Sequence, residues 1–113
     1  MTVDLLMAAK DAASALDQKF GKDIVVLDIR EISSIADYFI ITEAGNPNQV
    51  QAMVDEVGLV MDKYGVGLSH IEGMQKSDWV LMDFGDIIVH IFNEESRKFY
   101  DLERTWGDAQ VIT

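Results

Sequence analysis

Apolar residues occur along the chain at the two spacings that distinguish helices from strands. Between residues 2 and 20, and again between 47 and 64, they recur every three or four positions, which places them on one face of a helix. Runs of consecutive apolar residues, many of them β-branched, occupy positions 24–27, 38–42, 79–84 and 87–92, and a weaker run occupies 66–71. Such runs are typical of buried strands. The pattern predicts two amphipathic helices and about five strands.

The ends of both helices carry residues that helix ends favour. Thr2 can cap the first helix, and Gly21 suits a left-handed turn after it. Asn46 followed by Pro47 predicts the start of the second helix, because asparagine is a strong cap and a proline at the first helical position loses no needed N–H. Gly58 lies inside the second helix, where either a close packing contact or chance explains it.

The last third of the chain predicts a β-hairpin. Gly85 and Asp86 separate the strands 79–84 and 87–92, and such a pair is typical of a two-residue hairpin turn. Because the hairpin is antiparallel, an all-parallel doubly wound fold is excluded. The element order α-β-β-α-β-β-β-α predicts a mixed α/β fold, with one small mixed sheet flanked by helices.

Shorter helical segments are expected in two connections. The segment after the first strand is expected to form one helical turn, started by Ser33 or Ser34. Asn93 can cap a last helix over 94–100, whose two leading glutamates suit the positive end of the helix dipole. A further helical turn is expected over 102–106.

Composition narrows the class of protein. The 113 residues predict a single domain over 1–113 with a radius of gyration of about 13 Å. A hydrophobic fraction of 49% excludes a disordered chain, and the absence of cysteine excludes disulfides, iron–sulfur clusters and thiol nucleophiles. No apolar run is long enough to span a membrane. The start of the chain lacks the basic and apolar segments of a targeting sequence, so a cytoplasmic protein is expected.

The charge balance bears on the choice of partner. Twenty acidic residues against nine basic ones give a net charge of −11, spread evenly over the two halves of the chain. Phosphate backbones repel such a surface, so free DNA or RNA is not expected to bind. A basic protein surface is a suitable partner, because opposite potentials speed encounter. The alternative is that the charge serves solubility alone.

The search for catalytic or metal-binding residues finds little. His90 lies in the middle of a predicted strand, where a hydrogen-bonded structural histidine is expected. Asp86 and His90 would be roughly 13 Å apart along a strand and cannot share a metal ion, so no metal and no cofactor is expected. A nucleotidyltransferase needs two carboxylates at i and i+2 on a strand, whereas Asp83 and Asp86 flank a turn. A diverged metal-dependent enzyme using these two aspartates is the remaining enzymatic alternative.

The strand 79–84 offers a candidate binding surface. Its alternate positions form two sets, which are Trp79, Leu81 and Asp83, and Val80, Met82 and Phe84. If the second set packs inward, a tryptophan and a leucine face outward beside a carboxylate, as in an interface anchor. The alternative is that the C-terminal helix covers Trp79 through Tyr100 or Trp106.

Three blocks of the sequence together carry a specific pattern. They are DIVVLDIREISSIADYFII at 23–41, the segment 71–73 with WVLMDFGDIIVHIF at 79–92, and RKFYDLERTWGDA at 97–109. On these blocks, which cover nearly the whole chain in order, the sequence resembles the ribosomal silencing factor family, also called Iojap-like. The resemblance implies a fold similar to nucleotidyltransferases without their catalytic carboxylates, and therefore no enzymatic activity.

The resemblance also implies a function. Such a factor binds the large ribosomal subunit through ribosomal protein L-fourteen, blocks association with the small subunit and represses translation when nutrients are short. Family members occur in bacteria, mitochondria and chloroplasts. The absence of a transit peptide favours a bacterial cytoplasm for this chain.

Carried over to this sequence, the resemblance identifies candidate contact residues. They are Trp79, Leu81, Met82, Asp83 and Phe84, with Asp37 and Tyr38 as secondary candidates. Trp79 is the proposed centre of the interface, and Asp83 the proposed partner of a basic side chain. Many relatives carry a basic residue before the second helix, whereas the stretch 43–49 carries none here, so a contact that relatives make there is not carried over to this chain. The Trp79 surface is also a candidate for joining two copies of the chain as a homodimer.

Overall fold

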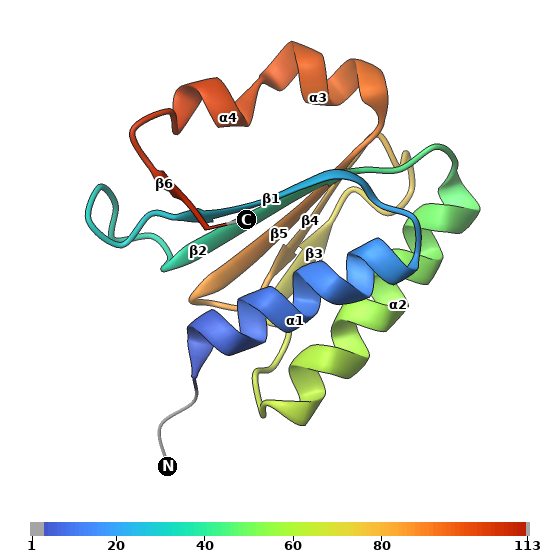
Figure 1. The fold of residues 1–113 in the computed structure, drawn as a ribbon. Helices are drawn as coiled ribbons and strands as arrows, with labels where there is room; N and C mark the ends of the chain where they lie inside the picture. Colours follow the sequence, from blue (N-terminus) through green and yellow to red (C-terminus); the bar gives the residue numbers. More distant parts are fainter. Residues whose placement is uncertain (1–3, 113) are drawn as a thin grey trace.

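A six-stranded mixed sheet separates two layers of helices in the computed structural model, which describes residues 4–112 (Figure 1). In chain order the elements are α1 (Leu5–Gln18), β1 (Lys22–Asp28), β2 (Tyr38–Glu43), α2 (Pro47–Lys63), β3 (His70–Glu72), β4 (Trp79–Asp83), β5 (Ile87–Phe92), α3 (Glu94–Tyr100), α4 (Leu102–Thr105) and β6 (Gln110–Val111). Helices α1 and α2 cover one face of the sheet, and α3 and α4 lie over the other. The mixed α/β class predicted from the sequence is confirmed.

The strand order is β3-β4-β5-β2-β1-β6. The neighbours β2 and β5 are parallel, and the other adjacent pairs are antiparallel. Two parallel strands cannot be joined by a tight turn, so the chain leaves β2 through α2 and returns through β3 and β4. The hairpin of β4 and β5 is confirmed, with Asp83 opposite Ile88.

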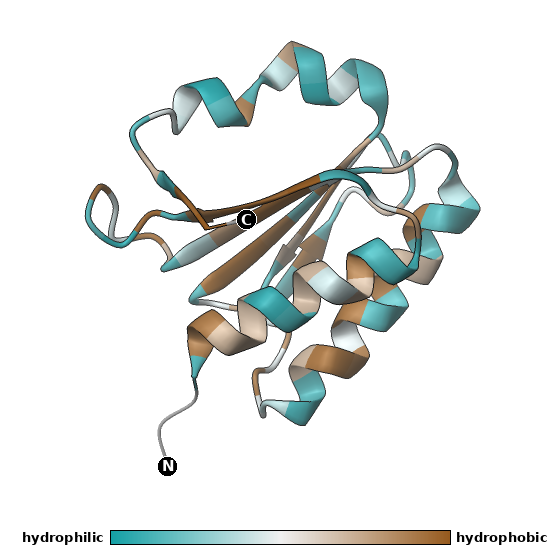
Figure 2. Cartoon of the chain, viewed as in Figure 1, coloured by the Kyte–Doolittle hydropathy of each residue, from teal (hydrophilic) through white to brown (hydrophobic). Residues whose placement is uncertain are grey.

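The larger core lies between the sheet and the pair α1–α2. It contains the apolar stripes of both helices and the alternate residues of the central strands. From β4 it includes Val80 and Met82, and Phe84 follows directly after the strand. Of the two alternating sets of residues in 79–84, the set Val80, Met82 and Phe84 therefore points into the core. Figure 2 shows the hydrophobic strands enclosed between the two helical layers.

A smaller apolar cluster fills the space under α3 and α4. Its buried members are Leu27, Ile29, Ala36, Phe39, Ile41 and Phe92. Trp79, Leu102 and Trp106 are only partly buried against it. The short helices thus cover this sheet face incompletely, whereas α1 and α2 cover the opposite face closely. This difference leaves part of β4 accessible.

Arg97 attaches α3 to the start of β1. Its guanidinium donates hydrogen bonds to the backbone carbonyls of Lys22 and Asp23, at 3.0 and 2.6 Å, and pairs with Glu103 at 3.0 Å. At this point β1 shifts its register against β2, and Asp23 has a φ of 50°. Backbone carbonyls need hydrogen-bonding partners, and a side chain 75 positions after Lys22 supplies one here.

The ends of α1 differ from the sequence prediction. The helix begins at Leu5, and the Asp4 carboxylate accepts a hydrogen bond from the Met7 N–H at 3.0 Å, while Thr2 lies outside the described residues. Phe20, and not Gly21, adopts the left-handed conformation, with a φ of 66°. A Cβ on Gly21 would lie 2.8 Å from Thr42 Oγ1. Glycine is needed there for close packing and not for its φ.

The remaining connections confirm one prediction and correct others. Asn46 caps α2 by accepting from the Gln49 N–H at 2.8 Å, as expected. A Cβ on Gly58 would meet no atom within 4 Å, so no close contact explains this glycine. The segment before Tyr38 forms turns and no helix, and its first turn is closed on the Ile29 carbonyl, ahead of the serines.

In place of the strand predicted over 66–71, the structure has the three-residue strand β3. The strand β6 was not predicted from the sequence. Neither has a strong local signal, because β6 is only two residues long and exposed. Among the described residues, no helix is long and apolar enough to cross a membrane.

Candidate functional site

The outer face of β4 is the candidate binding surface. Trp79, Leu81 and Asp83 alternate along it and are all partly exposed, on the sheet face that α3 and α4 cover incompletely. Cross-strand neighbours complete the surface, with Leu81 flanked by Glu72 of β3 and by His90 of β5. We call Trp79, Leu81 and Asp83, together with Ile88, the β4 surface. It combines apolar area with a carboxylate, as the sequence predicts.

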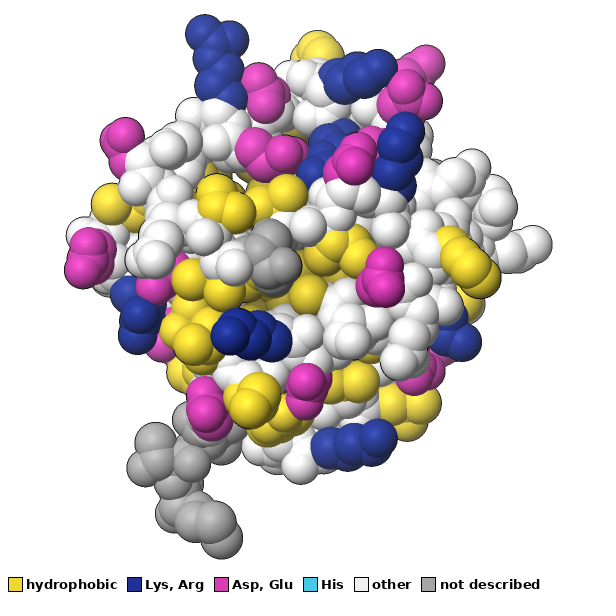
Figure 3. Space-filling model, in the orientation of Figure 1, with side chains coloured by type: hydrophobic (Ala, Val, Ile, Leu, Met, Phe, Trp, Pro, Cys, Tyr) yellow, Lys and Arg dark blue, Asp and Glu magenta, His cyan; other side chains and the backbone are white. Residues whose placement is uncertain are grey.

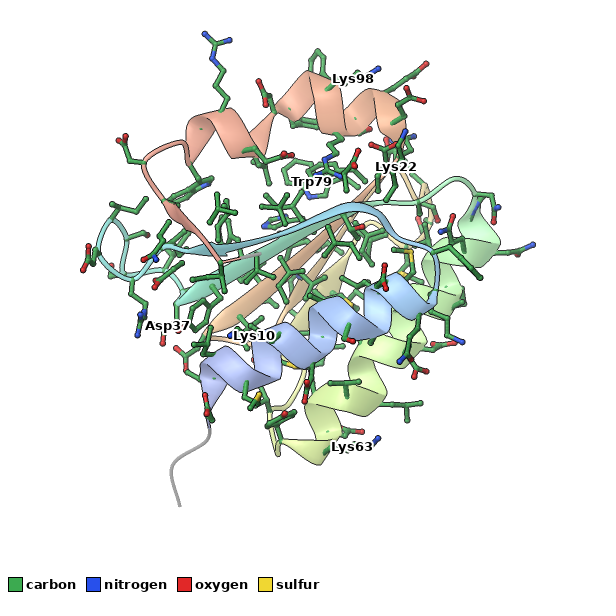
Figure 4. All side chains as sticks on the ribbon, in the orientation of Figure 1. Lys10, Lys22, Asp37, Lys63, Trp79 and Lys98 are labelled. Atoms are coloured by element: carbon green, nitrogen blue, oxygen red, sulfur yellow. The ribbon has the colours of Figure 1, made fainter. Side chains whose placement is uncertain are left out.

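Trp79 is half-buried between α3 and the sheet (Figure 4). Its ring lies 4.5 Å from that of Tyr100 and 5.1 Å from that of Phe92, measured between centroids. The indole Nε1–H donates a hydrogen bond to His90 Nδ1 at 3.1 Å. Tyr100 therefore covers part of Trp79, as the structural alternative proposed, whereas Trp106 packs on Phe39 at 5.0 Å. The uncovered part of the indole remains available to a partner.

Three candidate contact residues are not available. Met82 is 1% exposed, Phe84 is 5% exposed and Tyr38 is 3% exposed, and all three lie in the core under α1 and α2. Strand alternation explains the error for Met82, because a residue next to an outward-facing one points inward. Burial also raises the pKa of the Tyr38 phenol. The structure therefore places these three side chains in the core, and not at a contact surface.

Asp37 and Asp83 lie toward the same end of the sheet. The Asp37 and Tyr38 N–H groups both donate to the Asp86 carbonyl in the turn between β4 and β5, at 2.8 and 3.1 Å. Asp83 Oδ1 accepts from the Gly85 N–H at 2.7 Å, which holds the same turn. Asp37 is half-buried and Asp83 partly exposed. Asp83 therefore places a partly exposed carboxylate at this end of the β4 surface.

Ile88 is a member of the surface that sequence reasoning missed. It lies directly opposite Asp83 and is only partly buried. The signal was present, since a two-residue turn after Phe84 pairs Phe84 with Ile87 and therefore Asp83 with Ile88. The neighbouring apolar residues of β5 are buried, which concealed the different position of Ile88.

His90 is a hydrogen-bonded buried residue, as predicted. Burial lowers the pKa of its imidazole to about 4, so the ring is neutral at physiological pH. Because Nδ1 accepts the bond from Trp79, the single ring proton lies on Nε2. Asp83 and Asp86 flank the turn without forming a carboxylate pair on one strand. Among residues 4–112, no three His, Asp or Glu side chains gather closely enough to hold a metal ion.

Charged side chains of both signs are also present outside the β4 surface. On the face drawn in Figure 3, acidic and basic side chains are interspersed over α3 and α4 and do not form one patch of a single sign. The stretch between β2 and α2 is held by Gln49, whose side chain bonds the Gly45 N–H and the Lys19 and Phe20 carbonyls. The structure is thus that of a small mixed α/β protein with one sheet face incompletely covered by helices.

Comparison with known proteins gives the family. A family model described as "Ribosomal silencing factor during starvation" matches residues 3–113. Ribosomal silencing factor RsfS of Bacillus subtilis is 43% identical over 102 residues, which cover 90% of this chain and 86% of that protein. The chloroplastic protein Iojap of Zea mays is 32% identical over 109 residues, and the match covers 96% of this chain and 47% of the maize protein.

Solved structures agree with this assignment. A crystal structure from Chromobacterium violaceum superposes with a TM-score of 0.86 at 33% identity, covering 95% of this chain and 88% of that one. A structure from Bacillus halodurans gives a TM-score of 0.79 at 33% identity and covers 97% of both chains. The chain belongs to the ribosomal silencing factor family, which confirms the resemblance noted in the sequence. Translational regulation at the ribosome is the function that this family name describes.

Proposed function

We propose that this protein binds the large ribosomal subunit through ribosomal protein L-fourteen and sterically blocks association with the small subunit. Translation is thereby repressed when nutrients are limiting, in a bacterial cytoplasm. Membership of the ribosomal silencing factor family supports the ribosomal role. The observation that carries the mode of binding is the partly exposed indole of Trp79, next to Leu81 and Asp83 on an incompletely covered sheet face.

The dimensions of the molecule support a steric mechanism. The principal extents are 38 × 30 × 22 Å, and the radius of gyration is 12.8 Å. Even the shortest extent is many times a van der Waals contact distance. Two subunit surfaces that must touch cannot close around a folded body of this thickness. Occupancy of the docking site is then sufficient, and no chemical step is needed.

The charge supports a protein contact and not a contact with bare RNA. A net charge of −11 is attracted to a basic ribosomal protein and repelled by phosphates. Asp83 is the proposed partner of a basic side chain, because its carboxylate is partly exposed beside an apolar anchor. A standard interface would bury about 800 Å² on each partner.

Sedimentation with purified large subunits tests the proposal. The native protein is expected to travel with large subunits and to reduce the formation of joined ribosomes. Trp79→Ala is expected to weaken binding at least about thirtyfold, as loss of a central aromatic anchor does. Leu81→Ala is expected to weaken it less. Leu59→Ala is the matched control, because Leu59 is an exposed leucine on α2 in the opposite layer.

Two results would contradict the proposal. One is native-like binding by Trp79→Ala with an unchanged circular dichroism spectrum. The other is a failure of the native protein to travel with large subunits at all. If Trp79→Ala only unfolds, Trp79 acts as a core residue and the interface lies elsewhere.

The enzymatic alternative and self-association are tested separately. Saturable Mg²⁺ or Mn²⁺ binding that raises the melting temperature would support a metal-dependent enzyme using Asp83 and Asp86. For self-association, the same β4 surface would join two copies, so large subunits should convert dimers to monomers. Analytical ultracentrifugation with and without Trp79→Ala measures this.

A further inference from the structure

His90 is unusual among the buried polar side chains of this fold. Thr42 and Arg97 donate hydrogen bonds to backbone carbonyls, including that of Lys22, and so supply hydrogen-bonding partners to the backbone. His90 is 4% exposed, lies in the middle of β5, and bonds the side chain of Trp79 on the neighbouring strand. Its one hydrogen bond therefore serves the β4 surface and not the backbone.

An imidazole at this position lowers the free energy of unfolding relative to an apolar ring. Nδ1 accepts from Trp79, so Nε2 carries the proton, and Nε2 is buried without a hydrogen-bonding partner among the described residues. A buried donor without a partner lowers the free energy of unfolding. The ring also makes apolar contacts, with centroids 4.9 Å from Phe39 and 6.2 Å from Phe92. A phenyl ring would keep these contacts and remove the unpaired donor.

The packing around Trp79 restrains its ring but leaves one direction open. Tyr100 and Phe92 contact the indole at interplanar angles of 45° and 30°. Such contacts confine the plane of the indole, but neither of these two rings distinguishes the edge that carries the N–H. The bond from Nε1 to His90 Nδ1 distinguishes the two edges. It fixes which edge of the indole is buried and which part stays accessible.

We propose that His90 is a positioning residue of the β4 surface, which holds the Trp79 indole in its binding orientation before the partner arrives. This inference rests on the proposed function, because it assigns a role within the same surface. An anchor that is already ordered loses less conformational entropy on binding, so the complex is tighter. The histidine is thus kept for binding, at some cost to stability.

The free protein tests the first half of the inference. In nuclear magnetic resonance spectra, the Trp79 indole N–H should exchange slowly with solvent, and Trp106→Phe assigns the signal. His90→Phe should speed this exchange at least tenfold. An indole N–H that exchanges freely in the native protein would overturn the inference without any ribosome being present.

Binding to purified large subunits tests the second half. His90→Phe should melt at the same temperature as the native protein or higher, yet bind about five- to tenfold more weakly, since the oriented hydrogen bond is lost. His90→Asn places an amide oxygen where Nδ1 lies, so it should bind more tightly than His90→Phe although it melts lower. A merely structural role predicts the opposite, with binding following the melting temperature.

The outcomes separate this inference from the proposed function. If His90→Phe binds as the native protein does while Trp79→Ala does not, the positioning role is wrong and the β4 surface stands. If Trp79→Ala also binds normally, the surface itself is wrong, and the role of His90 is overturned with it.

Discussion

Thr42, His90 and Arg97 are buried polar side chains that join segments distant in the sequence. Thr42 and Arg97 both donate to the Lys22 carbonyl, from positions 20 and 75 residues later in the chain. His90 joins β5 to Trp79. Each of these bonds compensates part of the cost of burying a polar group. At the scale of single residues, the accessible part of the β4 surface depends on this small number of contacts.

The buried imidazole predicts a pH dependence of stability. The pKa of His90 is about 4 in the folded protein, against 6.5 when unperturbed, so the unfolded chain takes up the proton first. The free energy of unfolding should therefore be highest above about pH 6.5, fall as pH decreases and level off below about pH 4. The total loss is about 3 kcal/mol. Urea unfolding between pH 4 and 7 measures it.

The same titration has a matched control. His90→Phe should lack the loss between pH 6.5 and 4, whereas His70→Phe, which removes an exposed imidazole on β3, should keep it. An equal slope in all three proteins would contradict the assignment to His90. Asp28, whose pKa is lowered chiefly by hydrogen bonding to Arg30, contributes only at lower pH.

Two glycines predict opposite effects of the same substitution. Gly21→Ala should destabilise the protein by about 1–3 kcal/mol, because the new Cβ would lie 2.8 Å from Thr42 Oγ1 and 3.0 Å from the Leu16 carbonyl oxygen. Gly58→Ala should stabilise it by about 0.5–1 kcal/mol, because it lies within α2 with nothing within 4 Å of its Cβ position. Thermal melting of both variants measures the difference. A loss of stability in Gly58→Ala would contradict the absence of a close neighbour at this position.

At the scale of elements, the two helical layers are attached differently. The larger core joins α1 and α2 to the sheet along its whole length. The helices α3 and α4 have only 7 and 4 residues and rest on a smaller apolar cluster. Helices this short are not stable alone in water. Their position depends on side-chain contacts, chiefly those of Arg97 with the first residues of β1.

Loss of Arg97 should therefore loosen α3. Arg97→Met keeps the aliphatic part of the side chain but leaves the Lys22 and Asp23 carbonyls without this donor, which should lower the free energy of unfolding by about 2–4 kcal/mol. Arg104→Met is the control, because Arg104 is an exposed arginine on α4. Near-ultraviolet circular dichroism should change only in Arg97→Met, because Tyr100 of α3 packs on Trp79. If the two variants have equal free energies of unfolding, Arg97 does not stabilise the contact between α3 and β1.

At the scale of the whole molecule, charge and shape act together. In the proposed complex, the net charge of −11 would attract a basic partner over distances beyond the contact surface, and the β4 surface would set the orientation of docking. The extents of 38 × 30 × 22 Å make the bound protein an obstacle from any side. Encounter rate and complex lifetime should therefore respond to different changes in the molecule.

Ionic strength should affect mainly the rate of association with large subunits. Raising it from 0.01 to 0.15 M shortens the screening length from about 30 to 8 Å and should slow association roughly tenfold. Asp83→Asn should also shorten the lifetime of the complex, whereas Asp55→Asn on α2, with the same change in net charge, should not. Stopped-flow fluorescence measures both. A rate that does not depend on salt would contradict electrostatic attraction.

Much of the fold was predictable because the signals were local. The Asn46–Pro47 start of α2, the turn at Gly85 and Asp86 and the apolar runs of the central strands follow from backbone preferences and burial. The predictions that were wrong concern short or exposed segments. β6 has two residues, and the first turn of the segment after β1 closes on the Ile29 carbonyl, ahead of the serines that suggested a helix.

For the candidate site, alternation correctly separated Trp79, Leu81 and Asp83 from their inward neighbours. Met82 and Phe84 belong to the same family pattern, but such a pattern includes residues that pack in the core as well as residues that bind a partner. Tyr38 also belongs to the family pattern and is likewise a core residue, so the prediction that it contacts a partner is wrong for the same reason. Ile88 could be found only by carrying the hairpin register across to β5.

The sequence by itself determined the amphipathic helices, the central strands, the family and the overall charge, because each depends on residue types close together in the chain or on their sum. The tertiary structure decided how much of Trp79 is covered, which nitrogen of His90 accepts the hydrogen bond from the indole, and why Gly21 cannot carry a side chain. These features depend on atoms brought together from strands and helices far apart in the chain, and their distances are set only once the sheet has its register and the short helices have packed on it.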